Sequence, residues 1–141
     1  MVFTNAKTMS TLKKCITLSS QVSKIDDAVS ALVGFVIRLK RMEDFSLSIS
    51  LTEAITNAII HGNEKNPAKR VFAQARIEPE RVVFQIADEG TGFDYQKLDD
   101  PTKKENLHKP SGRGIFFVRH FMDEVTFNHV GNEITMVKYV K

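Results

Sequence analysis

The sequence contains little of what several common classes of protein require. Its 141 residues include one cysteine, Cys15, so no disulfide can form within the chain. No apolar run approaches the roughly 18 residues that a membrane span needs, and the N-terminal stretch MVFTNAKTMSTLKK has no apolar core of a secretory signal. We therefore expect a cytoplasmic protein with no membrane partner.

An excess of charge of one sign is also missing. The formal net charge is +3, and the lysines and arginines are scattered among aspartates and glutamates rather than gathered in one patch. No nucleic-acid partner is expected on this basis. With 42% hydrophobic and 26% charged residues, no internal repeat and no low-complexity segment, the composition is that of a single globular domain over residues 1–141.

What the sequence does contain is a clear succession of strand and helix patterns. Alternation of polar and apolar residues predicts strands over 12–20, 70–78, 81–88, 124–130 and 133–140. Apolar residues at helical spacing predict helices over 25–39, 47–62 and 115–122. Because the strands arrive as adjacent hairpins, we expect an α+β fold. It would be a two-layer α/β sandwich with a mixed, mostly antiparallel sheet and helices on one face.

The second predicted helix carries polar side chains in a line. Glu53, Asn57 and His61 recur every four residues, on the side opposite an apolar stripe. A solvated polar face is one explanation, although such faces usually include lysine or arginine and this one has neither. The functional explanation makes Glu53 a general base and Asn57 an oxygen ligand for a hard cation such as Mg²⁺.

The strand VVFQIAD ends on a carboxylate. Asp88 has the same phase as Val82 and Ile86, so it points towards the core if that phase faces the helices. A buried carboxylate needs a hydrogen-bond donor. The donors could be backbone amides of the following turn, or a ligand group such as the exocyclic amine of adenine. Gly90 and Gly92 then permit a tight turn and a close approach of backbone to ligand.

The segment SGRGIFFVRHFMD begins a helix with two glycines. Gly112 and Gly114 leave free N–H groups at the helix start, which is a natural site for an anion, and Arg113 between them could reach a terminal phosphate. The alternative is a simple signal that one element stops and a helix starts. Neither the P-loop pattern nor the six-residue glycine fingerprint of dinucleotide-binding folds occurs in the chain.

These three motifs together resemble those of a known superfamily. Glu53-x-x-x-Asn57 with His61-Gly62, Asp88-x-Gly90-x-Gly92 and Gly112-x-Gly114 resemble the N, G1 and G2 boxes of the ATPases that include gyrase, histidine kinases and mismatch-repair proteins. Within that superfamily, TEAITNAIIHGNEKN, IADEGTGFD and SGRGIFFVRHFMDEV are most similar to the bacterial anti-sigma factor serine/threonine kinases. The resemblance spans nearly the whole chain.

The resemblance implies a site for ATP and Mg²⁺ between the helices and the sheet. It makes Glu53 the catalytic base, and it implies that Asn57 binds Mg²⁺ and that Asp88 binds the adenine amine. The polar stretch 93–111, which has neither helical nor strand periodicity, would be a lid that opens for nucleotide exchange and closes over ATP. The ATP-binding residues implied are Asn57, His61, Gly62, Asp88, Gly90, Gly92, Ser111, Gly112, Arg113, Gly114 and Thr135.

The resemblance also implies protein partners. Members of the family phosphorylate a serine or threonine of a small anti-sigma factor antagonist, and as homodimers they sequester a sigma factor. Many relatives instead regulate other targets in partner-switching circuits. Two alternatives to the kinase remain open: a nucleotide-gated binding module with little or no phosphotransfer, and a gyrase-type hydrolase in which the same base acts on water.

Overall fold

The structure is a computed structural model that describes residues 12–40, 42, 44–93 and 113–140. Its strands are β1 (Leu12–Ser19), β2 (Arg70–Ile77), β3 (Arg81–Ala87), β4 (Glu124–Phe127) and β5 (Glu133–Tyr139). Its α-helices are α2 (Ile25–Leu39), α3 (Asp44–Asn57) and α4 (Arg113–Phe121), with a 3-10 turn η1 (Val22–Lys24) and a π-helical turn η2 (Ala58–Gly62). No helix within these ranges is both long and apolar enough to cross a lipid bilayer.

The strands form one sheet in the order β1-β2-β3-β5-β4. Each neighbouring pair is antiparallel, which confirms the expected antiparallel character. Strand β3 lies at the centre, so its Phe84 pairs with Ala75 of β2 on one side and with Met136 of β5 on the other. In the hairpin formed by β4 and β5, it is therefore β5, and not β4, that pairs with β3.

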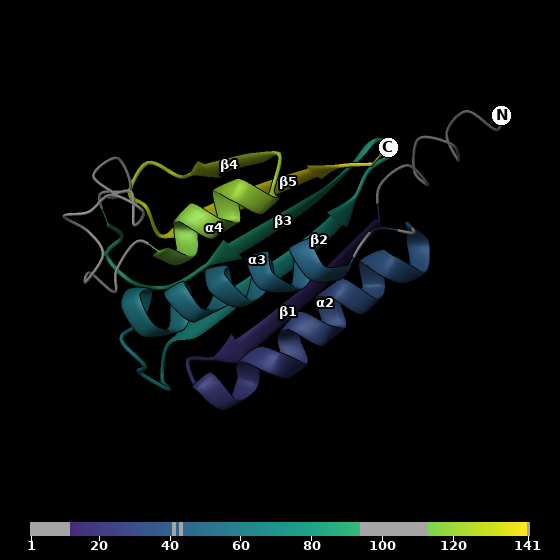
Figure 1. Cartoon of the computed structure of the whole chain (residues 1–141). Coiled ribbons are helices and arrows are strands. Elements are labelled where there is room, and N and C mark those ends of the chain that lie inside the picture. The colour runs from purple at the N-terminus through teal and green to yellow at the C-terminus, as the bar shows by residue number, and fades with distance from the viewer. Residues whose placement is uncertain (1–11, 41, 43, 94–112, 141) are drawn as a thin grey trace, which may run out of the picture.

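All three α-helices cover the same face of the sheet (Figure 1), as the predicted two-layer sandwich requires. The core forms because each element presents one apolar face to the other layer. The buried residues of α2 are three or four positions apart, and those of β2 and of the inner face of β3 alternate. They are Ile25, Ala28, Val29, Leu32, Val33 and Val36 in α2, Val71, Ala73, Ala75 and Ile77 in β2, and Val82, Phe84 and Ile86 in β3.

The second helix differs from its predicted bounds of 47–62 at both ends. It begins three residues earlier, at Asp44. The prediction took the first residue of the buried apolar stripe, Leu47, as the start, but the helix already has most of a turn before that residue. In that turn Phe45 packs edge-on against Phe121 of α4, with ring centroids 5.8 Å apart. At the other end the last five residues form η2, where the backbone N–H of Asn63 donates to Ala58 O at 2.8 Å. Such π turns occur frequently at functional sites.

Part of the predicted site lies outside the described residues. The expected lid over 93–111 is described only at Phe93, and Ser111 and Gly112 are not described. Arg113 is described as the first residue of α4, but its side chain is not. The lid and these two residues, together with the role of the Arg113 side chain, therefore stay predictions.

Candidate functional site

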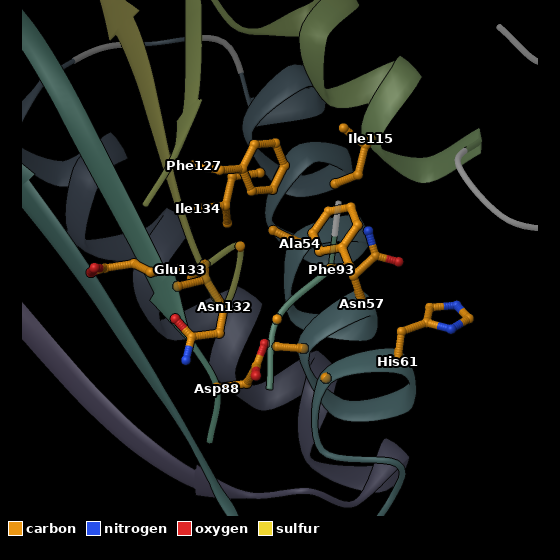
Figure 2. A pocket seen from close by; sticks show the side chains of 15 residues that line it. Ala54, Asn57, His61, Asp88, Phe93, Ile115, Phe127, Asn132, Glu133 and Ile134 are labelled. Carbon is orange, nitrogen blue, oxygen red and sulfur yellow. The ribbon is translucent and has the colours of Figure 1, made fainter. Parts of the chain in front are cut away.

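A cavity of about 240 Å³ lies between the C-terminal part of α3 and the ends of the central strands (Figure 2). It is bounded by α3 and η2, by the segment that follows β3, by the start of α4 and by the β4–β5 hairpin. Five of the predicted site residues line it: Asn57, His61, Gly62, Asp88 and Gly92. Two motifs that are separated in the sequence therefore meet at one cavity.

Asp88 lies at the end of β3, half-buried on the inner face of the sheet. The backbone N–H of Gly90 donates to Asp88 Oδ1 at 2.7 Å. Within the described part of the chain, Asp88 Oδ2 receives no hydrogen bond. Burial raises the pKa of Asp88 above its ordinary value, and the Gly90 N–H and the nearby Lys69 ammonium offset only part of that rise. The turn therefore satisfies one carboxylate oxygen and leaves the other for a ligand donor.

Two glycines let Asp88 occupy this position. A Cβ on Gly62 would overlap the Asp88 carboxyl group, and a Cβ on Gly90 would overlap the backbone carbonyl of Gly62. In Figure 2 the Asp88 carboxylate lies between Asn132 and the helical segment that carries Asn57 and His61. The end of the α3–η2 segment and the turn after β3 are thus in backbone contact, which no residue with a side chain would permit.

Gly92 allows a second close contact. Its φ angle is +87°, in the left-handed region, and a Cβ at this position would overlap the carbonyl oxygen of Val130. The segment after β3 therefore runs against the β4–β5 hairpin, where Gly131, with φ +83°, meets the backbone of Phe93 in the same way. This agrees with the expectation that Gly92 serves a turn that other residues resist.

Replacing Gly92 by Ala should lower the free energy of unfolding by about 1–3 kcal/mol or more, because alanine adds a Cβ clash to an unfavourable φ angle. Gly34→Ala is the matched control. Gly34 lies inside α2 and a Cβ there would meet nothing within 4 Å, so the substitution should stabilise the chain by about 0.5–1 kcal/mol. Urea unfolding of both variants measures the difference, and equal stabilities for Gly92→Ala and the wild type would contradict the described contact.

The polar line along α3 and η2 is only partly directed at the cavity. Asn57 and His61 both line it, but His61 is exposed at the rim and in Figure 2 points away from Asp88. Glu53 is half-buried and lies outside the lining, next to the start of α4. A Cβ on Gly114 would lie 2.5 Å from Glu53 Oε2, so glycine permits the first turn of α4 to approach this carboxylate. A carboxylate is favoured beside a helix N-terminus.

Thr135 requires a correction. It lies in β5 between Ile134 and Met136, whose buried side chains face the helices. Strand alternation therefore directs Thr135 to the opposite face of the sheet, where Gln85 Nε2 donates to its Oγ1 at 3.5 Å. The assignment of Thr135 to the nucleotide site is wrong, because the residues of β5 that line the cavity are Glu133 and Ile134.

The sequence interpretation missed the contribution of the β4–β5 hairpin. Asn132 lines the cavity, and its side-chain Nδ2 donates to the Gly90 carbonyl at 3.2 Å. Phe127 also lines it and packs edge-on against Phe93, with ring centroids 5.3 Å apart. In the sequence, the Gly131-Asn132 pair predicts a turn between two strands. It does not show that this turn contacts the segment that carries Asp88.

A two-layer sandwich with a cavity between its helices and an antiparallel sheet, and with a carboxylate at the end of the central strand, is the architecture of the histidine kinase-like ATPases. The family model described as "Histidine kinase-like ATPase domain" matches residues 17–138 of the chain. The chain therefore belongs to the histidine kinase-like ATPase family, and relatives with the names serine-protein kinase and anti-sigma F factor place it in the group of anti-sigma factor serine/threonine kinases.

Three of these relatives illustrate the similarity. "Serine-protein kinase RsbW" of Staphylococcus aureus is 34% identical over 108 residues, which cover 71% of this chain and 67% of the relative. "Anti-sigma F factor" of Bacillus velezensis is 30% identical over 131 residues, which cover 89% of this chain and 81% of the relative. The protein of the same name in Bacillus subtilis is 29% identical over the same extent. The comparisons confirm the resemblance that the three motifs suggested.

Proposed function

We propose that the chain is an ATP-dependent serine/threonine protein kinase that phosphorylates a small antagonist protein and acts as an anti-sigma-type regulator in a partner-switching circuit. The observation that carries this proposal is that Asp88 and Asn57, from separate motifs, line one cavity, while Glu53 lies one turn before Asn57 and beside the start of α4. The names of the relatives, serine-protein kinase and anti-sigma F factor, support the kinase and regulatory roles.

In this proposal the cavity holds the adenine ring. Its volume exceeds that of a purine base, and its walls include the apolar side chains of Ala54, Ile86, Ile115 and Ile134. Ligand sites with mostly apolar walls and a few polar groups suit an aromatic ring with a polar edge. Asp88 Oδ2, which has no donor among the described residues, would accept a hydrogen bond from the exocyclic amine.

The other end of the nucleotide would meet α3 and α4. ATP supplies the γ-phosphoryl group, and the free N–H groups at the start of α4 would bind phosphate oxygens. Glu53 would accept the proton of the serine or threonine hydroxyl. The hydroxyl oxygen would then bond to the γ-phosphorus, while the bond between that phosphorus and the β–γ bridging oxygen breaks and ADP leaves. The half-buried Glu53 carboxylate lies beside Gly114 of α4, which fits this role.

The donor set fits Mg²⁺ only if the nucleotide completes the site. Among the described residues no group of three or more His, Cys, Asp and Glu side chains could hold a metal ion. Asn57 offers a single amide oxygen at the cavity wall. Mg²⁺ commonly takes one or two protein oxygens and fills its octahedron with phosphate oxygens and water. We assign Asn57 that role.

The proposal includes a second partner and an assembly. A sigma factor, or another regulatory target of such a circuit, would be held by a homodimer in the cytoplasm, and all 141 residues would form one domain. The relatives named anti-sigma F factor support the sigma factor as partner, and sigma factors act on cytoplasmic RNA polymerase. The family resemblance supports the dimer, and the single hydrophobic core shared by all three α-helices and the sheet supports one domain.

Phosphate transfer to the antagonist tests the proposal. The chain, ATP labelled at the γ-phosphate, and Mg²⁺ are incubated with the small antagonist protein, and the product is analysed for phosphoserine and phosphothreonine. Labelled antagonist is the expected result. Antagonist that binds the chain more tightly with ATP than without it, yet acquires no label, would instead establish the nucleotide-gated binding module and contradict the kinase.

The affinity for ATP should fall as the pH is lowered, starting above the range in which an ordinary aspartate titrates. Burial raises the pKa of Asp88 in the folded chain, so the carboxylate that accepts the adenine amine is lost below that raised pKa. For the same reason ionised Asp88 lowers the stability of the nucleotide-free fold above its unfolded pKa. Calorimetric titration over the acidic range measures the effect, and an equal pH dependence in Asp88→Asn would contradict this cause.

A further inference from the structure

Asn63, the residue immediately after η2, is fully buried yet polar. Its side-chain Nδ2 donates to Ser20 Oγ at 2.8 Å and to the Arg70 carbonyl at 2.9 Å. Its Oδ1 accepts the backbone N–H of Glu89 at 2.8 Å. Both amide hydrogens and the carbonyl oxygen are therefore used. Asn63 does not line the cavity, and no role in the proposed function has yet been given to it.

These bonds connect three strand ends to the end of η2. Ser20 follows β1, Arg70 begins β2, and Glu89 lies in the turn after β3. The connection is closed by further bonds, because Ser20 Oγ donates to the Lys69 carbonyl at 2.8 Å and the Arg70 N–H donates to Glu89 Oε1 at 2.5 Å. Every polar group around the Asn63 side chain thus has a partner within this network, as a buried network requires.

The network acts on the Asp88 turn, by which we mean residues 88–90. Asn63 holds the Glu89 N–H, one residue after Asp88, and the preceding Gly62 lies against the Asp88 carboxyl group. From the opposite side Asn132 accepts the Asp88 N–H through its backbone carbonyl at 2.9 Å and donates its side-chain amide to the Gly90 carbonyl at 3.2 Å. The turn is held from both sides.

We propose that Asn63 is a positioning residue for base recognition: it fixes the Asp88 turn so that Asp88 Oδ2 faces the cavity at the place of the adenine amine. This rests on the proposed function. The reasoning is geometric. With Oδ1 bound by Gly90, the direction of Oδ2 depends on the backbone of the turn, and Asn63 is the only side chain in the described ranges that accepts the Glu89 N–H. A displacement of about 1 Å at such a site has large effects on recognition.

A positioning role and a purely structural one differ in what they change. Loss of a buried asparagine lowers stability in either case. Only a positioning role changes how well the folded chain distinguishes ATP from an analogue that carries hydrogen in place of the 6-amino group. The ratio of the two dissociation constants is independent of the folded fraction, so it separates the two roles.

The experiment measures both dissociation constants by calorimetry for the wild type and for Asn63→Ala. The wild type should prefer ATP about 5–150-fold, the value of one well-placed hydrogen bond to a charged acceptor. Asn63→Ala should lose most of this preference. Asn63→Ser, which is too short to reach both the Glu89 N–H and the Arg70 carbonyl, gives the same test should the alanine variant not fold.

Val33→Ala is the matched control. Val33 is buried in α2 and removed from the cavity lining, so its truncation lowers stability by core loss alone and should leave the preference unchanged. If folded Asn63→Ala or Asn63→Ser prefers ATP over the analogue as strongly as the wild type does, the inference is overturned and the proposed function stays intact. A wild type that binds both nucleotides equally would contradict the proposed adenine site itself.

Discussion

Replacing Glu53 by Ala should lower the rate of phosphoryl transfer to the antagonist by about 10²–10⁴, the usual contribution of a positioned general base. ATP affinity should change little, because Glu53 does not line the cavity that would hold the base. Its carboxylate lies beside Gly114 at the start of α4, where the γ-phosphate and the attacking hydroxyl would meet. Single-turnover transfer at saturating ATP measures the chemical step without contributions from binding.

Two further variants define the role of this carboxylate. Glu53→Gln keeps the size of the side chain but cannot accept the proton, so it should be nearly as slow as Glu53→Ala. Glu80→Ala removes an exposed carboxylate from the turn between β2 and β3, and its rate should equal that of the wild type. A wild-type rate in Glu53→Ala would remove Glu53 from the mechanism.

Replacing Asp88 by Asn should weaken ATP binding by about 1–3 kcal/mol, a rise of about 5–150-fold in the dissociation constant. The asparagine amide can still accept the Gly90 N–H through its oxygen. It then presents an NH₂ group, and not an acceptor, to the adenine amine. The fold should persist, because asparagine has the same size and shape as aspartate. Asparagine also carries no charge, so it avoids the cost of burial that raises the pKa of Asp88.

Asp123→Asn is the corresponding control. Asp123 accepts the backbone N–H of Tyr139 at 2.6 Å, at the end of the sheet remote from the cavity. Its replacement should leave the affinity for ATP unchanged. Calorimetry on both variants, with urea unfolding to verify that each is folded, gives the comparison, and an ATP affinity in Asp88→Asn equal to that of the wild type would refute the adenine assignment.

The features that depend on local sequence could be predicted. Apolar alternation located β2 and β3, and helical spacing located α2. The phase of β3 indicated that Asp88 lies on the same face as Val82 and Ile86, because strand alternation needs no knowledge of distant residues, and the structure shows that this face meets the helices. Where the phase was not considered, the prediction failed: Thr135 was assigned to the site although its neighbours Ile134 and Met136 face the helices.

The features that depend on contacts between distant segments could not be predicted. Hairpin patterns do not show that β5, and not β4, lies next to β3. The Asn63 bonds join residues that are 43 and 26 positions apart, and the bond from Asn132 to Gly90 spans 42. Asn63 lies within the segment TEAITNAIIHGNEKN but was given no role there, and Asn132 lies in none of the motif segments. In the sequence both belong to turns, and only the fold brings them to the two sides of Asp88.

A crystal structure of the chain with Mg²⁺ and a non-hydrolysable ATP analogue tests the central claim most directly. The account predicts the adenine ring in the cavity between α3 and the sheet, with its amine at hydrogen-bond distance from Asp88 Oδ2. It also predicts the phosphates at the start of α4, near Glu53 and Asn57. A nucleotide bound elsewhere, or a cavity that stays empty when the analogue is saturating, would contradict it.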